Sequence, residues 1–199
     1  MGDPKRLTSK YSGPRHPWIK TRIEEEKKLT AEYGLKNKKE IYKATSKLKK
    51  YADQAKKLIA ATGKQSELEK TQLINKLNRL GLVSKTAQLD DVLSLTVRDL
   101  LDRRLQTILH KKGYARTTKQ ARQFITHGHI IINNKPLTIP SYLVTLAEEP
   151  SIQFIEKSSL ISTEHPERKF EKIKTAEKPE KKPTRKKKRK KKNKKQDKK

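Results

Sequence analysis

The fold of this chain is decided by one stretch, Ala115-Arg-Thr-Thr-Lys-Gln-Ala-Arg-Gln-Phe-Ile-Thr-His-Gly-His-Ile-Ile-Ile-Asn-Asn134, which runs from a basic helical pattern through a glycine into β-branched residues. Thr117 and Gln120 have the spacing of a capping box, in which the hydroxyl accepts an early backbone N–H and the glutamine reaches back to the cap. This spacing predicts a helix that begins at about Thr118.

The predicted helix has two different faces. Ala121, Phe124 and Ile125 fall on one side at helical spacing, so we expect them to be core residues rather than platforms for base stacking. A second stripe has the same spacing and offers hydrogen-bond donors: Lys119, Arg122, Gln123 and Thr126.

The residues after this helix predict a β-hairpin. Gly128 stands where a residue in the left-handed conformation would end the helix. His129 to Asn133 is rich in β-branched residues, and Asn133-Asn134 is a turn pair. The helix is therefore expected to lead directly into the hairpin.

The chain before this stretch is predicted to form a small helical bundle. The expected helices are Pro17 to about Tyr33, about Lys38 to Ala61, and one opened by a Ser66–Glu69 capping box that ends at Gly81. Leu89 to Leu95 is expected to be a short apolar turn, and Thr96 with Asp99 is expected to cap the next helix.

The composition indicates a polyanionic partner, with nucleic acid as the first candidate. The chain has 51 Lys and Arg against 22 Asp and Glu, a formal net charge of +29 on 199 residues. Hydrophobic residues make up 31%, which favours two small cores over one large core. We expect no signal peptide, no membrane span, no disulfide and no thiolate zinc site, and therefore a cytosolic protein.

Both ends of the chain differ from its middle. Met1 to Pro17 contains three prolines and is expected to be an extended arm that orders only against a partner. Glu167 to Lys199 holds 19 Lys and Arg against 5 Asp and Glu, a local charge of +14, with almost no apolar residues. Such a segment cannot bury enough apolar surface to fold, so we predict a disordered basic tail.

Several segments resemble the RNA-binding module called the S-four domain, over residues 100 to about 156. The resemblance rests on Leu101-Asp102-Arg103-Arg104-Leu105, Ala115-Arg116-Thr117, Gln120-Ala121-Arg122-Gln123, Gly128-His129-Ile130, Asn133 and Pro140-Ser141-Tyr142-Leu143-Val144. Asn134 departs from the glycine usual there, but asparagine tolerates a positive φ.

The flanking segments resemble the archaeal branch of the S-four family of small-subunit ribosomal proteins. They are His16-Pro17-Trp18-Ile19-Lys20, Glu32-Tyr33-Gly34-Leu35-Lys36-Asn37-Lys38 and Lys76-Leu77-Asn78-Arg79-Leu80-Gly81. The expected fold class is therefore α+β: an arm over residues 1–17, a helical domain over 18–99, an S-four-type domain over 100–165 and a basic tail over 166–199.

The expected site is an RNA-binding surface. Arg116, Thr118 and Lys119 lie at the start of the predicted helix, where free N–H groups and the helix dipole favour a phosphate. With the positions that the resemblance implies, the predicted RNA-binding residues are Arg103, Arg104, Arg116, Thr118, Lys119, Arg122, Gln123, His129 and Lys135. His127-Gly128-His129 has no carboxylate or thiolate nearby in sequence, so no metal or cofactor is expected.

The resemblance implies a structural constituent of the small ribosomal subunit that binds small-subunit rRNA. It also implies proteins S three and S five as neighbours and a place near the path by which messenger RNA enters. One alternative is an RNA-modifying enzyme, but the chain shows no nucleophile elbow, Gly-rich phosphate loop or other catalytic constellation. Another is a stand-alone ribosome-associated factor, which the similarity of the N-terminal half disfavours.

Overall fold

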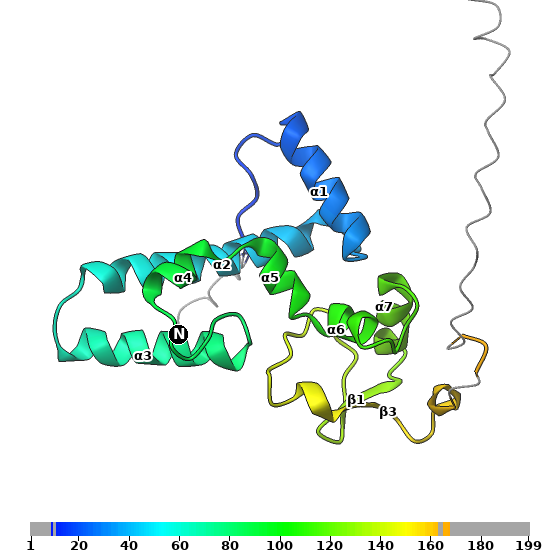
Figure 1. The fold of residues 1–199 in the computed structure, drawn as a ribbon. Coiled ribbons are helices and arrows are strands. Elements are labelled where there is room, and N and C mark those ends of the chain that lie inside the picture. Colours follow the sequence, from blue (N-terminus) through cyan, green and yellow to red (C-terminus); the bar gives the residue numbers. More distant parts are fainter. Residues whose placement is uncertain (1–8, 10, 163–164, 168–199) are drawn as a thin grey trace, which may run out of the picture. The chain divides into compact units, whose positions relative to one another are not determined.

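Helices dominate the N-terminal half of the computed structural model, which describes residues 9, 11–162 and 165–167 (Figure 1). The helices there are α1 (Lys20–Glu32), α2 (Lys38–Ala60), α3 (Lys64–Arg79), α4 (Leu89–Ser94) and α5 (Val97–Asp102). None of the described helices is both long and apolar enough to cross a bilayer. The tail predicted over 166–199 lies outside the described residues from position 168 onward.

Helices α1 and α2 follow the sequence pattern closely. Gly34 takes a left-handed φ of +59°, and the Leu35 N–H donates to the Thr30 carbonyl at 3.1 Å, which closes the end of α1. Helix α1 begins at Lys20, later than the Pro17 start that was predicted. Pro17 lies in the turn before the helix, where its carbonyl accepts a hydrogen bond from the Arg22 guanidinium at 2.9 Å.

Two local predictions in this half are wrong. Ser66 does not cap α3: the helix already begins at Lys64 after Gly63, and the Ser66 hydroxyl donates back to the Gly63 carbonyl at 2.7 Å. The segment after Gln88 is helix α4 rather than a simple turn, because the Asp91 carboxylate accepts the Gln88 N–H at 2.9 Å and forms a cap.

The predicted cap at Thr96 is confirmed. Its N–H and its hydroxyl both donate to the Asp99 carboxylate at 2.8 Å, and α5 begins at Val97. The part of the arm that the structure describes lies against α2, since the Ser12 N–H donates to the Ser46 hydroxyl at 3.2 Å. That segment therefore has a partner within the chain itself.

The C-terminal half packs two helices against a small sheet. Its elements are α6 (Leu105–Lys111), α7 (Thr118–Thr126), β1 (Ile130–Ile132), β2 (Lys135–Pro136), β3 (Ile152–Phe154) and the 3-10 turns η1 (Glu149–Ser151) and η2 (Ser159–Ile161). The antiparallel sheet has the order β2-β1-β3, with Ile131 opposite both Pro136 and Gln153. The α+β fold class is confirmed.

The predicted helix-to-hairpin passage is present in detail. Helix α7 begins at Thr118, where the Thr117 hydroxyl accepts the Gln120 N–H at 3.1 Å. Gly128 has a φ of +75°, and Asn133 and Asn134 have φ values of +48° and +61°. Two consecutive positive φ angles make a type I′ turn, which asparagine tolerates. Asn134 therefore performs the role for which the family uses glycine.

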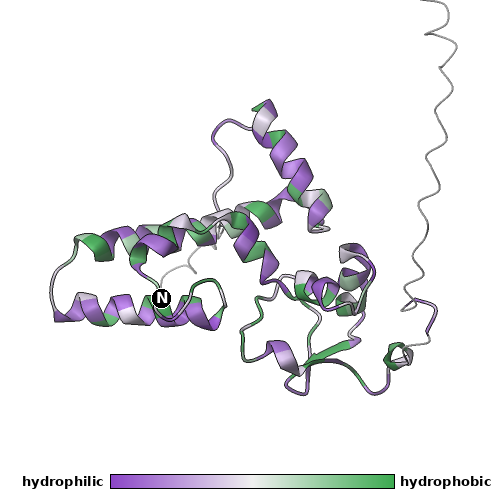
Figure 2. Cartoon of the chain, viewed as in Figure 1, coloured by the Kyte–Doolittle hydropathy of each residue, from purple (hydrophilic) through white to green (hydrophobic). Residues whose placement is uncertain are grey.

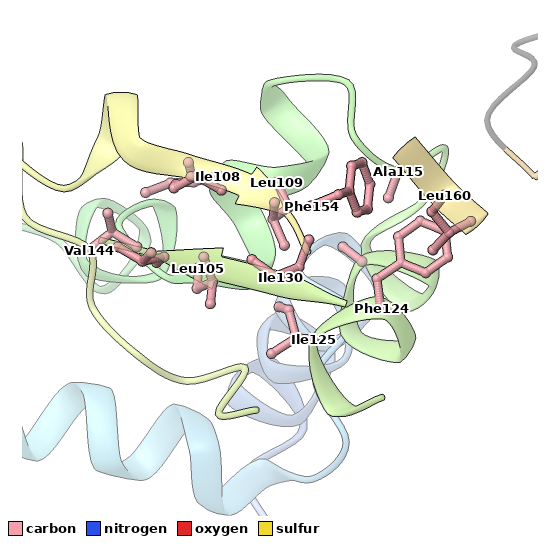
Figure 3. Close-up of a cluster of buried hydrophobic side chains, with 13 residues drawn as sticks. Leu105, Ile108, Leu109, Ala115, Phe124, Ile125, Ile130, Val144, Phe154 and Leu160 are labelled. Atoms are coloured by element: carbon pink, nitrogen blue, oxygen red, sulfur yellow. The ribbon is translucent and has the colours of Figure 1, made fainter. Parts of the chain in front are cut away.

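Two hydrophobic cores lie on either side of residues 102–104. The first joins α1 to α5 and includes Leu77, Leu100 and Leu101. The second joins α6, α7 and the sheet, with Leu105 and Ile130 fully buried (Figure 3). Figure 2 shows the strand β1 as apolar, whereas the long helices alternate polar and apolar residues, as amphipathic helices do.

Two polar contacts join these cores. The Glu40 carboxylate of α2 meets Arg104 at 2.6 Å and Arg122 at 3.2 Å. The buried Gln106 amide donates to the Tyr33, Gly34 and Thr118 carbonyls at 3.2, 3.1 and 2.8 Å. A Cβ at Gly34 would lie 2.5 Å from the Thr118 hydroxyl oxygen, so the turn after α1 fits α7 only with glycine.

Phe124 tests the second core. Its side chain is 2% exposed and packs edge-on against Phe154, with ring centroids 6.1 Å apart. Phe124→Ala should lower the free energy of unfolding by about 3 to 5 kcal/mol, measured by denaturant titration with circular dichroism. The exposed Gln123→Ala on the same helix should change it by less than about 0.5 kcal/mol. A Phe124→Ala variant as stable as the parent would contradict a core role.

Glu40 should make stability depend on pH. Burial alone would raise its pKa, but the hydrogen bonds and charges of Arg104 and Arg122 outweigh it and hold the pKa below its usual value. A lowered folded-state pKa stabilises the protein above the unfolded pKa of about 4.3, and this contribution is lost as pH falls through the folded value.

Glu40→Gln should therefore cost about 1.5 to 3 kcal/mol at pH 7, and the difference from the parent should shrink in acid, below about pH 4. Denaturant titrations at both pH values measure this. Glu32→Gln is the control, because its pair with Arg98 is exposed and spans 3.6 Å. Parallel pH profiles for the parent and Glu40→Gln would disprove the linkage.

Candidate nucleic-acid interface

The exposed side of α7 carries three of the predicted RNA-binding residues. Arg116, Lys119 and Gln123 are exposed, and neither cation forms an ion pair within the described residues. The Gln120 side chain accepts the Arg116 N–H at 2.7 Å, one residue earlier than the expected bond to the cap. That bond fixes the backbone that carries Arg116, so this cation stands at a defined place beside the start of α7.

Thr118 faces the helical half of the molecule rather than solvent. Its side chain is half-buried against Gly34, and its carbonyl accepts a hydrogen bond from Gln106 at 2.8 Å. The structure therefore uses Thr118 to attach α7 to the helical half of the molecule.

The hairpin side holds two more predicted residues. Lys135 is exposed on β2. His129 is half-buried, with Nδ1 3.0 Å from the Ser158 hydroxyl, and its ring lies parallel to that of His127 with centroids 6.2 Å apart. Within the residues that the structure describes, no group of three His, Cys, Asp or Glu could hold a metal ion.

Arg103 and Arg104 are consecutive but have different partners. Arg103 meets the Glu149 carboxylate at 2.9 Å and donates to the Val144 carbonyl at 3.1 Å, with 15% of its side chain exposed. Arg104 is 5% exposed and its guanidinium is held by Glu40. Both guanidinium groups are thus engaged in holding the fold together.

Arg122 is intermediate between the exposed cations and the arginines that are held by carboxylates. It shares the Glu40 carboxylate with Arg104, yet 27% of its side chain remains exposed. One carboxylate therefore neutralises only half of the charge of two guanidinium groups. The remaining positive charge faces the space between α2 and α7.

That space is a cleft of about 360 Å³. It is lined by Asn37, Lys39, Glu40, Lys43, Ala44, Lys47, Leu100, Leu101, Arg104, Arg122, Pro140, Ser141 and Leu143. Five cations and one carboxylate give this lining a formal charge of +4. A concave surface with a net positive charge concentrates its potential, so the cleft is suited to an anion.

The three lysines of α2 in this cleft were not among the predicted site residues. Lys39, Lys43 and Lys47 are four residues apart and lie along one face of α2. Burial, with a smaller effect of Lys76, lowers the pKa of Lys47. The sequence shows the spacing of these lysines, but it does not show that this face of α2 packs beside Arg104 and Arg122.

The predicted residues thus fall into groups. Arg104 and Arg122 meet at Glu40; Arg116, Lys119 and Gln123 share the exposed side of α7; His129 and Lys135 belong to the strand and hairpin that follow. Arg103 belongs to none of these groups, because its guanidinium forms an ion pair with Glu149. The exposed groups offer cations and amide donors, which is the chemistry that phosphates and ribose hydroxyls require.

Comparisons with known proteins agree with this reading. The S4 domain family matches residues 103–149. A protein of Methanococcus aeolicus named small ribosomal subunit protein uS4 is 51% identical over 178 residues, 89% of this chain and 100% of its own length. Its namesake in Methanococcus maripaludis strain C5 is 51% identical over 169 residues, 84% of this chain and 95% of its own.

These relatives bear the name of a ribosomal constituent rather than of an enzyme, and the similarity includes both the helical half and the S4 domain. The chain belongs to the uS4 family of small ribosomal subunit proteins.

Proposed function

We propose that this chain is a structural constituent of the small ribosomal subunit, where it binds small-subunit rRNA directly and supports subunit assembly and translation. The observation that carries this proposal is the +4 cleft together with Arg116, Lys119 and Lys135 of the S4 domain, which form no ion pair within the described residues. Family membership supplies the ribosomal setting.

Binding would be driven mainly by charge. Each lysine or arginine that neutralises a phosphate releases condensed counterions, so affinity should fall steeply as salt is raised. Selectivity would come from the shape of the folded RNA and from its ribose hydroxyls, because the grooves of RNA helices hide the base edges from most side chains.

The nine predicted site residues divide into two roles in this proposal. The contacting residues are Arg116, Lys119, Arg122, Gln123, His129 and Lys135, to which we add Lys39, Lys43 and Lys47 of α2. Arg103, Arg104 and Thr118 act as positioning residues, because their side chains are held by Glu149, by Glu40 and against Gly34.

The two hydrophobic cores support a division into a helical domain over residues 18–99 and an S4-type domain over about 100–165. Leu100 and Leu101 belong to the first core and Leu105 to the second, which supports a boundary close to Asp102, slightly later than the predicted one after residue 99. The cleft would then lie between the two domains, and the RNA would touch both.

The resemblance to the S-four family also suggests particular neighbours. We place ribosomal proteins S three and S five beside this chain, near the path by which messenger RNA enters a cytoplasmic ribosome. No cofactor takes part in this function.

Sedimentation separates the leading function from a stand-alone factor or an RNA-modifying enzyme. The tagged chain should remain in the small-subunit peak of a sucrose gradient after a high-salt wash, at a constant ratio to the subunit. A transient factor or an enzyme would be released by the wash, and its appearance only in the top fractions would refute the proposal.

Removal of the exposed cations of α7 should reduce both RNA affinity and its salt dependence. For Arg116→Ala with Lys119→Ala, the slope of log K against log salt should fall by about one to two units, because it tracks the number of neutralised phosphates. Filter binding to small-subunit rRNA over a series of salt concentrations measures this slope.

The control is Lys64→Ala with Lys85→Ala, which removes the same charge from exposed positions at the start of α3 and after its end. Native circular dichroism is required of both double variants. Equal slopes for the two would mean that the exposed side of α7 does not touch the phosphates.

A further inference from the structure

Trp18 is the single tryptophan of the chain and is 89% exposed, the largest value among the exposed large hydrophobic residues that the structure describes. An isolated exposed leucine or isoleucine is ordinary, but a tryptophan usually buries most of its ring. Ile19 beside it is 46% exposed. Figure 1 shows the start of α1, which this residue precedes, as the end of the helix that points away from the other helices.

The surroundings of Trp18 are strongly basic. From Pro4 to Ile23 the sequence contains six Lys and Arg and no Asp or Glu. Arg15 and Lys20 flank the tryptophan, are exposed, and form no ion pair within the described part of the chain. A cationic segment around an exposed aromatic ring is complementary to a polyanion that carries flat apolar groups.

The turn that contains Trp18 is held in place by contacts of Arg22. Arg22 donates to the Pro17 carbonyl at 2.9 Å and lies 3.1 Å from the Glu26 carboxylate. Glu26 is 4% exposed and is itself held by Lys38 at 2.9 Å. The backbone before Trp18 is therefore tied through Arg22 to a buried carboxylate at the α1–α2 contact, which lowers the entropic cost of ordering the ring on a ligand.

We propose that Trp18 stacks on an unpaired base of RNA while Arg15 and Lys20 contact the phosphates beside it. The inference rests on the proposed rRNA binding and adds a base contact on the N-terminal segment, separate from the cleft and from α7. Aromatic stacking accepts any base, because every base has a π-face. Trp18 would therefore anchor a single-stranded or bulged nucleotide without reading its identity.

RNA fits this surface better than a protein groove does. A groove that took the ring would also have to accept the charges of Arg15 and Lys20, which are exposed and form no ion pair within the described residues, whereas an RNA strand presents a phosphate beside every base. The hydrogen bond on Pro17 holds the backbone before Trp18, while the side chain itself stays 89% exposed and accessible to a base.

The test uses the full chain and the small-subunit rRNA of Methanococcus aeolicus as the probe. Because Trp18 is the only tryptophan, its fluorescence reports on this position alone. Titration with the rRNA should quench the emission. Single-stranded oligouridylate should also quench it, whereas an abasic strand with the same number of phosphates should not.

Affinity for the rRNA, measured by filter binding, should fall by about 5- to 150-fold in Trp18→Ala. Trp18→Phe should keep most of the affinity, and Trp18→Leu should behave like Trp18→Ala, since leucine is apolar but cannot stack. Arg22→Ala should give an intermediate loss, because the ring remains but the contacts that hold its turn are removed. Leu68→Ala, a truncation at a 59% exposed position of α3, should leave the affinity unchanged.

Each other outcome has a distinct meaning. If the rRNA binds Trp18→Ala as tightly as the parent and leaves the parent's emission unchanged, the stacking is wrong and the proposed function stands. A blue-shifted, unquenched emission of the parent, together with full affinity of Trp18→Leu for the rRNA, would mean that the ring enters an apolar pocket. That result would also overturn the stacking proposal. If the parent does not bind the rRNA at all, the proposed function fails together with this inference.

Discussion

The double ion pair of Glu40 is the constraint on which the arrangement of this molecule depends. One carboxylate of α2 meets Arg104 at the start of α6 and Arg122 in α7, so a single residue of the helical half holds two residues of the S4 half. Removing the Glu40 and Arg104 charges from water is expensive, and their close contact at 2.6 Å offsets that cost only while both groups are present. Two uncharged contacts join the same two halves of the molecule. The buried Gln106 amide donates to the Gly34 carbonyl, and the absence of a Cβ at Gly34 lets the turn between α1 and α2 lie against α7.

This junction also shapes the surface that we assign to RNA. Because Glu40 cancels one positive charge and orients two guanidinium groups, the cleft keeps a charge of +4 in a fixed geometry. The lysines that face it come from α2, whereas Arg122 comes from α7, so the charge distribution exists only when the two halves are packed together. Holding the fold and binding the partner are therefore separate tasks for different arginines: Arg104 is buried against Glu40, whereas Arg116 is exposed before α7.

Much of the S4 half could be predicted from local patterns. Thr117 marked the start of α7, Gly128 its end, and Asn133-Asn134 the turn, because each signal acts through backbone geometry within four residues. The same reasoning failed at Ser66, where Gly63 offers an earlier start and the serine hydroxyl turns back to its carbonyl. It also missed helix α4, since the Gln88–Asp91 cap does not have the Ser or Thr that usually identifies such a box.

The sequence by itself determined the family, the basic character, the order of the elements and the core face of α7, because these depend on composition and on spacings of two to four residues. Only the tertiary structure decided which arginines are free. Arg104 and Arg122 have the same side-chain chemistry as Arg116, but their common partner Glu40 lies 64 and 82 residues away in the sequence. Patterns of neighbouring residues cannot predict a contact over such a separation, because α2 meets α6 and α7 only through the packing of two separate cores. The same packing turned an ordinary lysine repeat of α2 into one wall of a cleft.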